Sequence, residues 1–181
     1  MHDYKIYKSD VIVDNHEEFV RICDHASKML RREFRDATNT TWIYDRYNIF
    51  SNTAPNDLFY DLYKDLHKCI RDYVGDDRKI WFQSWLNYLS YDEVENVLDM
   101  HGHGLDIHGY ISIDPKKTIT EFVNFEVENE VGNIYIGPTG DEYQHRVKNT
   151  GLWEGSRITL GFDCIFGADF HQSPNKFFPV L

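Results

Sequence analysis

The sequence predicts a single α+β domain in which an antiparallel β-sandwich or barrel is flanked by helices. Two segments in the N-terminal part carry apolar residues at helical spacing, and from residue 79 onward the pattern changes to about seven short strands. The 181 residues suit one domain, and no internal repeat or domain boundary is visible. We assign a helical part to about 1–75, a sheet core to about 79–165, and an irregular tail to the remainder.

Composition limits the classes of function. An apolar content of 41% and an aromatic content of 15% are sufficient for a packed core. The net charge of −11 argues against a nucleic-acid backbone or an anionic membrane as the main partner. Cys23, Cys69 and Cys164 are odd in number and form no CxxC pair, which favours reduced thiols. With no signal segment and no membrane-spanning run, we expect a cytoplasmic protein.

The N-terminal segment begins with an expected edge strand at residues 4–13. Asn15 and Glu18 have the spacing of a capping box, in which Asn15 would be the N-cap and Glu18 would reach back. Apolar residues then recur at helical spacing, so we expect a helix over about 15–34.

A long polar and aromatic connection is expected at residues 36–55. The next apolar stripe predicts a second helix, capped at its start by Asn56 or Asp57. Gly75 is expected to end this helix, because glycine readily adopts the left-handed conformation found there. Its stripe predicts core packing rather than a binding surface.

The remaining chain reads as strands and links. Residues 79–90 form an aromatic-rich strand, residues 91–99 a polar link, and residues 165–181 an irregular tail. Further strands are expected at 108–113, 118–128 and 133–136, from His145, and at 157–163.

The segment around residues 99–113 contains His101, His103 and His108, with glycines between them. Alternate residues of an extended chain face one side, so a His-x-His pair can hold one metal ion. Neutral imidazoles suit Fe, Zn, Cu or Ni. Taken alone, the cluster fits a solvated glycine-rich turn equally well. His145, at the start of a later strand, offers a third ligand.

Arg157 lies inside an apolar strand. An arginine in such a place needs an anionic partner, and its planar fork can bind a carboxylate through two hydrogen bonds. Thr159, two residues further on, should place its hydroxyl on the same side.

Short motifs follow one another in an order and spacing that resemble the Fe(II)- and 2-oxoglutarate-dependent oxygenases, especially small phage and bacterial members. The resemblance covers about residues 80–163 and implies a double-stranded β-helix, or jelly roll. The motifs are Trp85-Leu-Asn87, His101-x-His103, strand 108–113, Gly132 to Pro138, His145-Arg-Val, and Ser156-Arg-Ile-Thr-Leu-Gly-Phe162.

The resemblance implies that His101 and His145 bind iron. It also implies that Arg157, aided by Thr159, binds the C5 carboxylate of 2-oxoglutarate. Position 103 departs from the family pattern, which has Asp or Glu there. His103 could be the third ligand, Asp106 could supply the carboxylate, or water could fill the position.

Further residues are implied near the cosubstrate. His108 begins the strand where some relatives place a second 2-oxoglutarate contact, but a half-buried histidine bonded to the backbone is an equal alternative. Either Asn87 or Tyr88 should face the pocket, because they alternate along one strand.

The implied activity is hydroxylation of a peptidyl or small-molecule substrate, with O2 consumed and succinate and CO2 released. One rival is a cupin-like metal enzyme that does not use 2-oxoglutarate and would not need Arg157. The other is a non-catalytic jelly-roll binding module. The partners expected are 2-oxoglutarate, O2 and an unidentified substrate, with no membrane and no nucleic acid. If the gene is carried by a phage, the enzyme would act in the host cytoplasm. The sequence does not give the oligomeric state.

Overall fold

The computed structural model describes residues 3–34, 48–53, 56–96, 99–167 and 177–180. No helix within these ranges is long and apolar enough to cross a membrane. The helices are α1 Asp10–Asp14, α2 His16–Phe34, α3 Ile49–Thr53, α4 Asp57–Val74, α5 Tyr91–Asn96 and the 3-10 turn η1 Asp141–Tyr143. The strands are β1 Lys5–Lys8, β2 Ile80–Leu89, β3 Ile107–Asp114, β4 Thr118–Phe122, β5 Glu126–Glu128, β6 Asn133–Pro138, β7 His145–Asn149, β8 Arg157–Phe166 and β9 Phe178–Val180.

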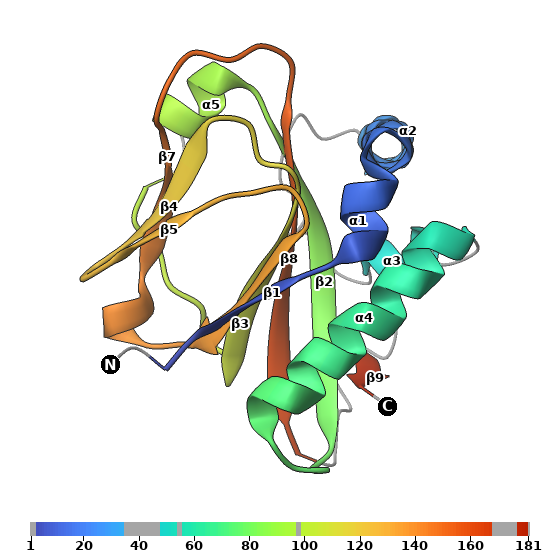
Figure 1. Ribbon diagram of the computed structural model, residues 1–181, viewed down its shortest axis with the longest axis vertical. Helices are drawn as coiled ribbons and strands as arrows, with labels where there is room; N and C mark the ends of the chain where they lie inside the picture. Colours follow the sequence, from blue (N-terminus) through green and yellow to red (C-terminus); the bar gives the residue numbers. More distant parts are fainter. Residues whose placement is uncertain (1–2, 35–47, 54–55, 97–98, 168–176, 181) are drawn as a thin grey trace.

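The strands form two antiparallel sheets, so the expected α+β class is confirmed at this level. One sheet has the order β1-β6-β3-β8-β2-β9 and the other the order β5-β4-β7. Helices α1 to α4 lie on one side of the six-stranded sheet, and the three-stranded sheet lies on the other (Figure 1). Phe122 of β4 packs against Tyr135 of β6, with ring centroids 5.0 Å apart, so side chains of the two sheets meet.

The predicted edge strand at residues 4–13 is wrong in its second half. β1 ends at Lys8, and residues 10–14 form α1, in which Ile12 is fully buried. The predicted capping box is also wrong. Asn15 closes the end of α1, where its side-chain amide donates to the carbonyl of Val11 at 2.9 Å, and Glu18 pairs with Arg21. Packing of Ile12 therefore overrides the strand preference of the β-branched run.

The two long helices are confirmed. α2 begins at His16, one residue after the expected start. The Asn56 side chain accepts hydrogen bonds from the backbone of Leu58 and Phe59 at the start of α4, and Gly75 ends that helix with φ of 76°. Most of the expected connection at 36–55 lies outside the described residues, but its described part contains α3.

Three C-terminal expectations need correction. The polar link at 91–99 contains α5, because Ser90 and Glu93 form a capping box that links the Glu93 carboxylate to Ser90 N at 2.7 Å. The expected strand 118–128 is two strands, β4 and β5, which pair with each other. The tail contributes β9, which pairs with β2.

Alternation along the central strands separates an apolar face from a polar face. On the helix-covered face, Phe82, Ile111 and Phe162 belong to the main core beneath α2 and α4. The opposite, inner face carries polar residues at the intervening positions of β2, β3 and β8. These residues are Gln83, Asn87, His108, Ser112, Arg157, Thr159 and Asp163, all buried except the half-buried Asn87. A buried polar interior between two sheets is the setting expected for a binding site rather than for a core.

We expect Gly109→Ala to destabilise the fold by about 1–3 kcal/mol, because overpacking in a closely packed core costs this much. A Cβ at Gly109 would lie 2.1 Å from Phe162 Cζ and 2.5 Å from the carbonyl oxygen of Tyr135, and the latter belongs to a paired strand. Urea denaturation measures the loss. Gly104→Ala is the matched control, since nothing lies within 4 Å of its added Cβ. Equal losses in the two variants would contradict this account.

Candidate metal centre

Strand register places polar side chains in rows across the inner face. Gln83 of β2 and His108 of β3 both pair with Asp163 of β8, so these three side chains stand next to one another. Along the inner face of β8, Asp163 is followed by Gly161 and then by Thr159. Asn87 of β2 and Ser112 of β3 both pair with Thr159. Neighbouring residues in a cross-strand row lie about 5 Å apart, which brings distant parts of the sequence into one site.

His101 and His145 are held together by their backbones. The N–H of His101 donates to the carbonyl of His145 at 3.0 Å, and the N–H of His145 donates back at 2.8 Å. This isolated antiparallel bridge continues the pairing at the edge of β7. Gly102 and Gly104 flank His103 in the extended loop that leads to β3. The loop therefore delivers His101 and His103 to the position where β7 begins.

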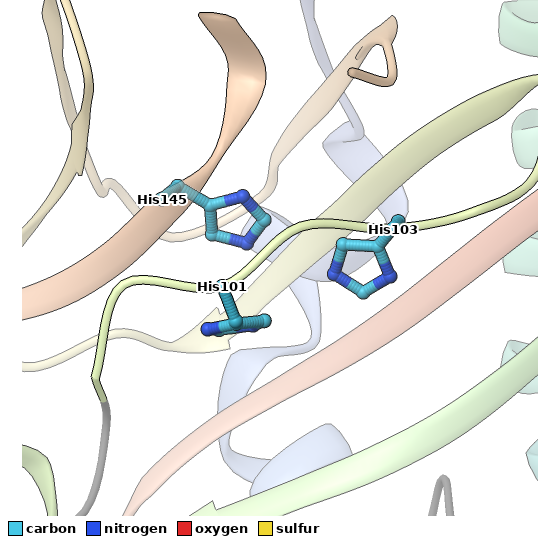
Figure 2. Close-up of side chains that lie close together, drawn as sticks. All are labelled: His101, His103 and His145. Carbon is cyan, nitrogen blue, oxygen red and sulfur yellow. The ribbon is translucent and has the colours of Figure 1, made fainter. Parts of the chain in front are cut away.

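His101, His103 and His145 form a cluster that could hold a metal ion, because ligand atoms of all three lie within 4.8 Å of one another. Figure 2 shows the three rings turned toward a common space, two from the loop and one from β7. Ring centroids are 4.7 Å apart for His101 and His145, 5.4 Å for His103 and His145, and 5.5 Å for His101 and His103. The exposure decreases from His101 through His103 to His145, which is buried. The cluster is therefore most accessible at His101.

The environment favours uncharged imidazoles. Burial, followed by the neighbouring histidines, lowers the pKa of His145 well below its usual value. The same causes lower the pKa of His108 to about 4. A metal binds the neutral imidazole, so His145 has no proton to release at neutral pH when an ion binds.

A second set of residues lies directly behind the first. The Asp163 carboxylate accepts from His108 Nδ1 at 2.8 Å and from His103 Nδ1 at 3.2 Å, and Gln83 Nε2 donates to it at 3.3 Å. Burial alone would raise the pKa of Asp163, but the hydrogen bonds from the two histidines outweigh burial and lower it. Asp163 is therefore an anion inside the domain, and it was not among the residues predicted for the site.

Arg157 is buried at the other end of the same inner face, with 3% of its surface exposed. Its guanidinium donates to the hydroxyls of Thr118 at 3.3 Å and Thr159 at 3.2 Å. Among the described residues, no carboxylate lies within ion-pair distance of it. Burial lowers the pKa of Arg157 to about 10, so it still carries its charge at neutral pH. A buried cation without an anion is costly, and a bound carboxylate would remove that cost.

Three buried hydroxyls face the same interior without meeting normal hydrogen-bond geometry to any described residue. They belong to Tyr110, Ser112 and Tyr135. Burial raises the pKa of Tyr110, while a hydrogen bond with Thr120 and then the charge of Arg157 lower it, so both groups lie near the Tyr110 hydroxyl. Ser112 and Tyr135 have no hydrogen-bond partner among the described residues, and buried hydroxyls without partners are uncommon, so these two indicate a polar ligand. The sequence analysis missed all three, although alternation from His108 marks Tyr110 and Ser112.

The structure separates the remaining predicted residues. Asn87 faces the interior, where its amide donates to Thr159 Oγ1 at 3.4 Å. Tyr88 faces the helix side, and its hydroxyl donates to Asp24 of α2 at 2.9 Å, so of the two alternatives it is Asn87 that faces the interior. Asp106 is exposed and accepts from the backbone N–H of Phe166 at 2.7 Å, and it belongs to neither histidine set. The alternative in which Asp106 supplies the metal carboxylate is therefore not supported.

The site thus combines a three-histidine cluster, an anionic aspartate behind it, and a buried arginine with free hydroxyls further along the same face. No protein family model and no curated protein matches this chain.

Proposed function

We propose that the chain is an Fe(II)- and 2-oxoglutarate-dependent dioxygenase that hydroxylates a peptidyl or small-molecule substrate. The observation that carries the proposal is the buried Arg157, which lacks an ion-pair partner among the described residues and shares an interior with the histidine cluster. A metal site alone fits many functions. A metal site together with a buried arginine that has no carboxylate partner among the described residues fits a cosubstrate with a chelating end and a distant carboxylate.

The strand order supports a double-stranded β-helix. Strands β6-β3-β8-β2 stand opposite β5-β4-β7, and the His101–His145 bridge occupies the place of a fourth strand beside β7. In such a fold the metal ligands come from the start of one strand and the loop beside it. That is where His145 and the His101–His103 loop lie.

The residues present fit an iron ion. His103 Nε2 is buried and has no hydrogen-bond partner among the described residues, as expected for a lone pair reserved for a metal. Imidazole nitrogen suits Fe(II), although this set has a third histidine in place of the carboxylate of the usual facial triad. His101, His103 and His145 would hold the ion.

The residues at the other end fit a carboxylate. Arg157 can offer a charge-assisted fork, with Thr159 and Tyr110 as hydroxyl partners. His145 pairs with Phe122 of β4, and Arg157 contacts Thr118, four residues earlier on that strand. Four residues span about 13 Å along a strand, so the histidine cluster and Arg157 lie beside opposite ends of β4, as a cosubstrate with two separated binding ends requires.

Bound iron and 2-oxoglutarate would supply the oxidising chemistry, with decarboxylation to succinate and CO2. The chain contributes binding and order. Arg157 would bind the far carboxylate of the cosubstrate, the histidines would hold the iron that binds its other end, and the apolar rings of Tyr110, Phe122 and Tyr135 would keep bulk water away from the interior between them. The exposed side of His101 leaves an approach for the substrate.

The test is an anaerobic titration of the metal-free protein with Fe(II) and then with 2-oxoglutarate, followed by visible absorption. We expect a metal-to-ligand charge-transfer band that requires both additions, and succinate formation once O2 is admitted. Bound iron without this band would favour the cupin-like alternative. Failure to bind any iron would favour a non-catalytic module.

A further inference from the structure

Position 103 is a histidine where the oxygenase pattern has a carboxylate, and the carboxylate of Asp163 in β8 lies behind that histidine. We propose that Asp163 is a positioning residue of the metal centre, which holds His103 and His108 with their protons on Nδ1 and so directs His103 Nε2 toward the metal. This inference rests on the metal-binding part of the proposed function and does not depend on 2-oxoglutarate.

The contacts of Asp163 fix the protons on both rings. An ionised carboxylate can only accept hydrogen bonds, so each ring nitrogen that faces it must carry a proton. Asp163 Oδ1 lies 2.8 Å from His108 Nδ1 and 3.1 Å from His103 Nδ1. Both rings therefore carry the proton on Nδ1, and in their neutral form both have a lone pair on Nε2.

The other two ligands follow the same rule with backbone acceptors. His101 Nδ1 lies 2.9 Å from the carbonyl oxygen of Asp99, and His145 Nδ1 lies 3.2 Å from that of Tyr143. All three histidines of the cluster thus have an oxygen behind Nδ1 and a free lone pair on Nε2. Such outer partners orient metal-bound histidines and raise their basicity.

His103, His108 and Asp163 could instead form a second metal site, since their ligand atoms also lie within 4.8 Å of one another. The ring geometry argues against one shared ion. The rings of His103 and His108 are stacked, with centroids 3.5 Å apart and planes 13° apart. Imidazole lone pairs lie in the ring plane, so two rings in face-to-face contact at 3.5 Å cannot direct them to one ion. The rings of His103 and His145 are also nearly parallel, with planes 8° apart, but their centroids are 5.4 Å apart, which is too far for face-to-face contact. His108 instead supports His103 from behind and shares its acceptor.

The sheet makes this support rigid. Asp163 is 5% exposed and lies on a central strand with a hydrogen-bonded neighbour on each side, β2 and β3. Trp85 stacks on both rings, with centroids 5.9 Å from His103 and 6.3 Å from His108. The ring of His103, although it lies on a loop, is therefore held in a fixed orientation by residues of the sheet. Metal sites require such fixed ligand orientations.

The first measurement is the tautomeric state of each histidine in ¹⁵N-labelled, metal-free protein at about pH 8, by long-range ¹H–¹⁵N correlation. We expect the proton on Nδ1 in His103 and His108, and we expect both protons to remain after saturation with Zn²⁺. In Asp163→Asn, the weaker neutral acceptor should allow His103 a population with the proton on Nε2.

The second measurement is Zn²⁺ affinity by competition with a chromophoric chelator. Loss of an outer-shell partner costs roughly 10–100-fold in metal affinity, and we expect a loss in that range for Asp163→Asn. Asp106→Asn is the matched control, since it makes the same change in an exposed carboxylate outside the cluster and should leave affinity unchanged.

Three results would overturn the inference. The first is an Nε2 proton on His103 in the wild-type protein, and the second is equal Zn²⁺ affinity in wild type and Asp163→Asn. The third is loss of the Nδ1 protons when Zn²⁺ binds, which would mean that the ion binds at Nδ1, in the alternative site of His103, His108 and Asp163. Failure of the proposed function looks different, because Zn²⁺ would bind with the expected tautomers while Fe(II) and 2-oxoglutarate gave no absorption band.

Discussion

His145→Ala is expected to lose Fe(II) binding by more than the roughly 10–100-fold that removal of an outer-shell partner costs. His145 is the buried member of the cluster and the one ligand that comes from β7. Its loss leaves two rings from one loop, and no other described residue of β7 can replace it. Competition with a chromophoric chelator under anaerobic conditions measures the change.

The control for this variant is His25→Ala, which removes an exposed histidine from α2. It should bind Fe(II) as the wild type does. If His145→Ala kept wild-type affinity, the metal would have to lie elsewhere, and the three-histidine centre would be abandoned.

Arg157→Met is expected to abolish the thermal stabilisation of the iron-loaded protein by 2-oxoglutarate. Truncating one partner of a buried charge pair costs about 2–5 kcal/mol, which corresponds to at least about a 30-fold loss of 2-oxoglutarate affinity. Without ligand the variant should be no less stable than wild type, since it replaces a buried cation that lacks an ion-pair partner among the described residues with an apolar chain of similar length. Differential scanning fluorimetry with and without 2-oxoglutarate measures both effects.

Arg146→Met is the matched control, because Arg146 already pairs with Glu121 at 2.6 Å and is only half-buried. It should keep the response to 2-oxoglutarate. Arg157→Lys keeps the charge but loses the fork, so an intermediate response is expected. A full response in Arg157→Met would remove the cosubstrate from the proposal and leave a metal protein of another kind.

The sequence was sufficient to predict those helices that are determined by residues within a single segment. The end of helix α4 could be predicted to the residue and its start to one of two neighbouring residues, because the cap candidates, the apolar stripe and Gly75 lie within one continuous segment. Helix α1 could not, because the β-branched run Val11-Ile-Val13 favours a strand and only contacts with α2 and α4 favour a helix. The Ser90–Glu93 capping box could have predicted α5, but the polar composition of the segment favoured a link.

The residues of the site likewise fall into those that could be predicted from the sequence and one whose contacts could not. His101, His103, His145 and Arg157 could be selected because residue type and order carry the information. Asp163 could not be connected to His103, since their contact depends on how β8 pairs with β3. Alternation from Arg157 through Thr159 and Gly161 does place Asp163 on the inner face, so its side was predictable although its partners were not.

The backbone bridge between His101 and His145 has a consequence for the supply of metal in a cell. Because folding itself brings these rings together, the centre is preorganised, and an arriving ion need not meet the entropic cost of gathering its ligands. A preorganised set of neutral imidazoles discriminates poorly among divalent ions, whose affinities rise from Fe(II) toward Cu(II). Under the proposed function, competition from nickel, copper and zinc would decide how many molecules carry iron, so the abundance of each metal around the protein, rather than the fold, would set the active fraction.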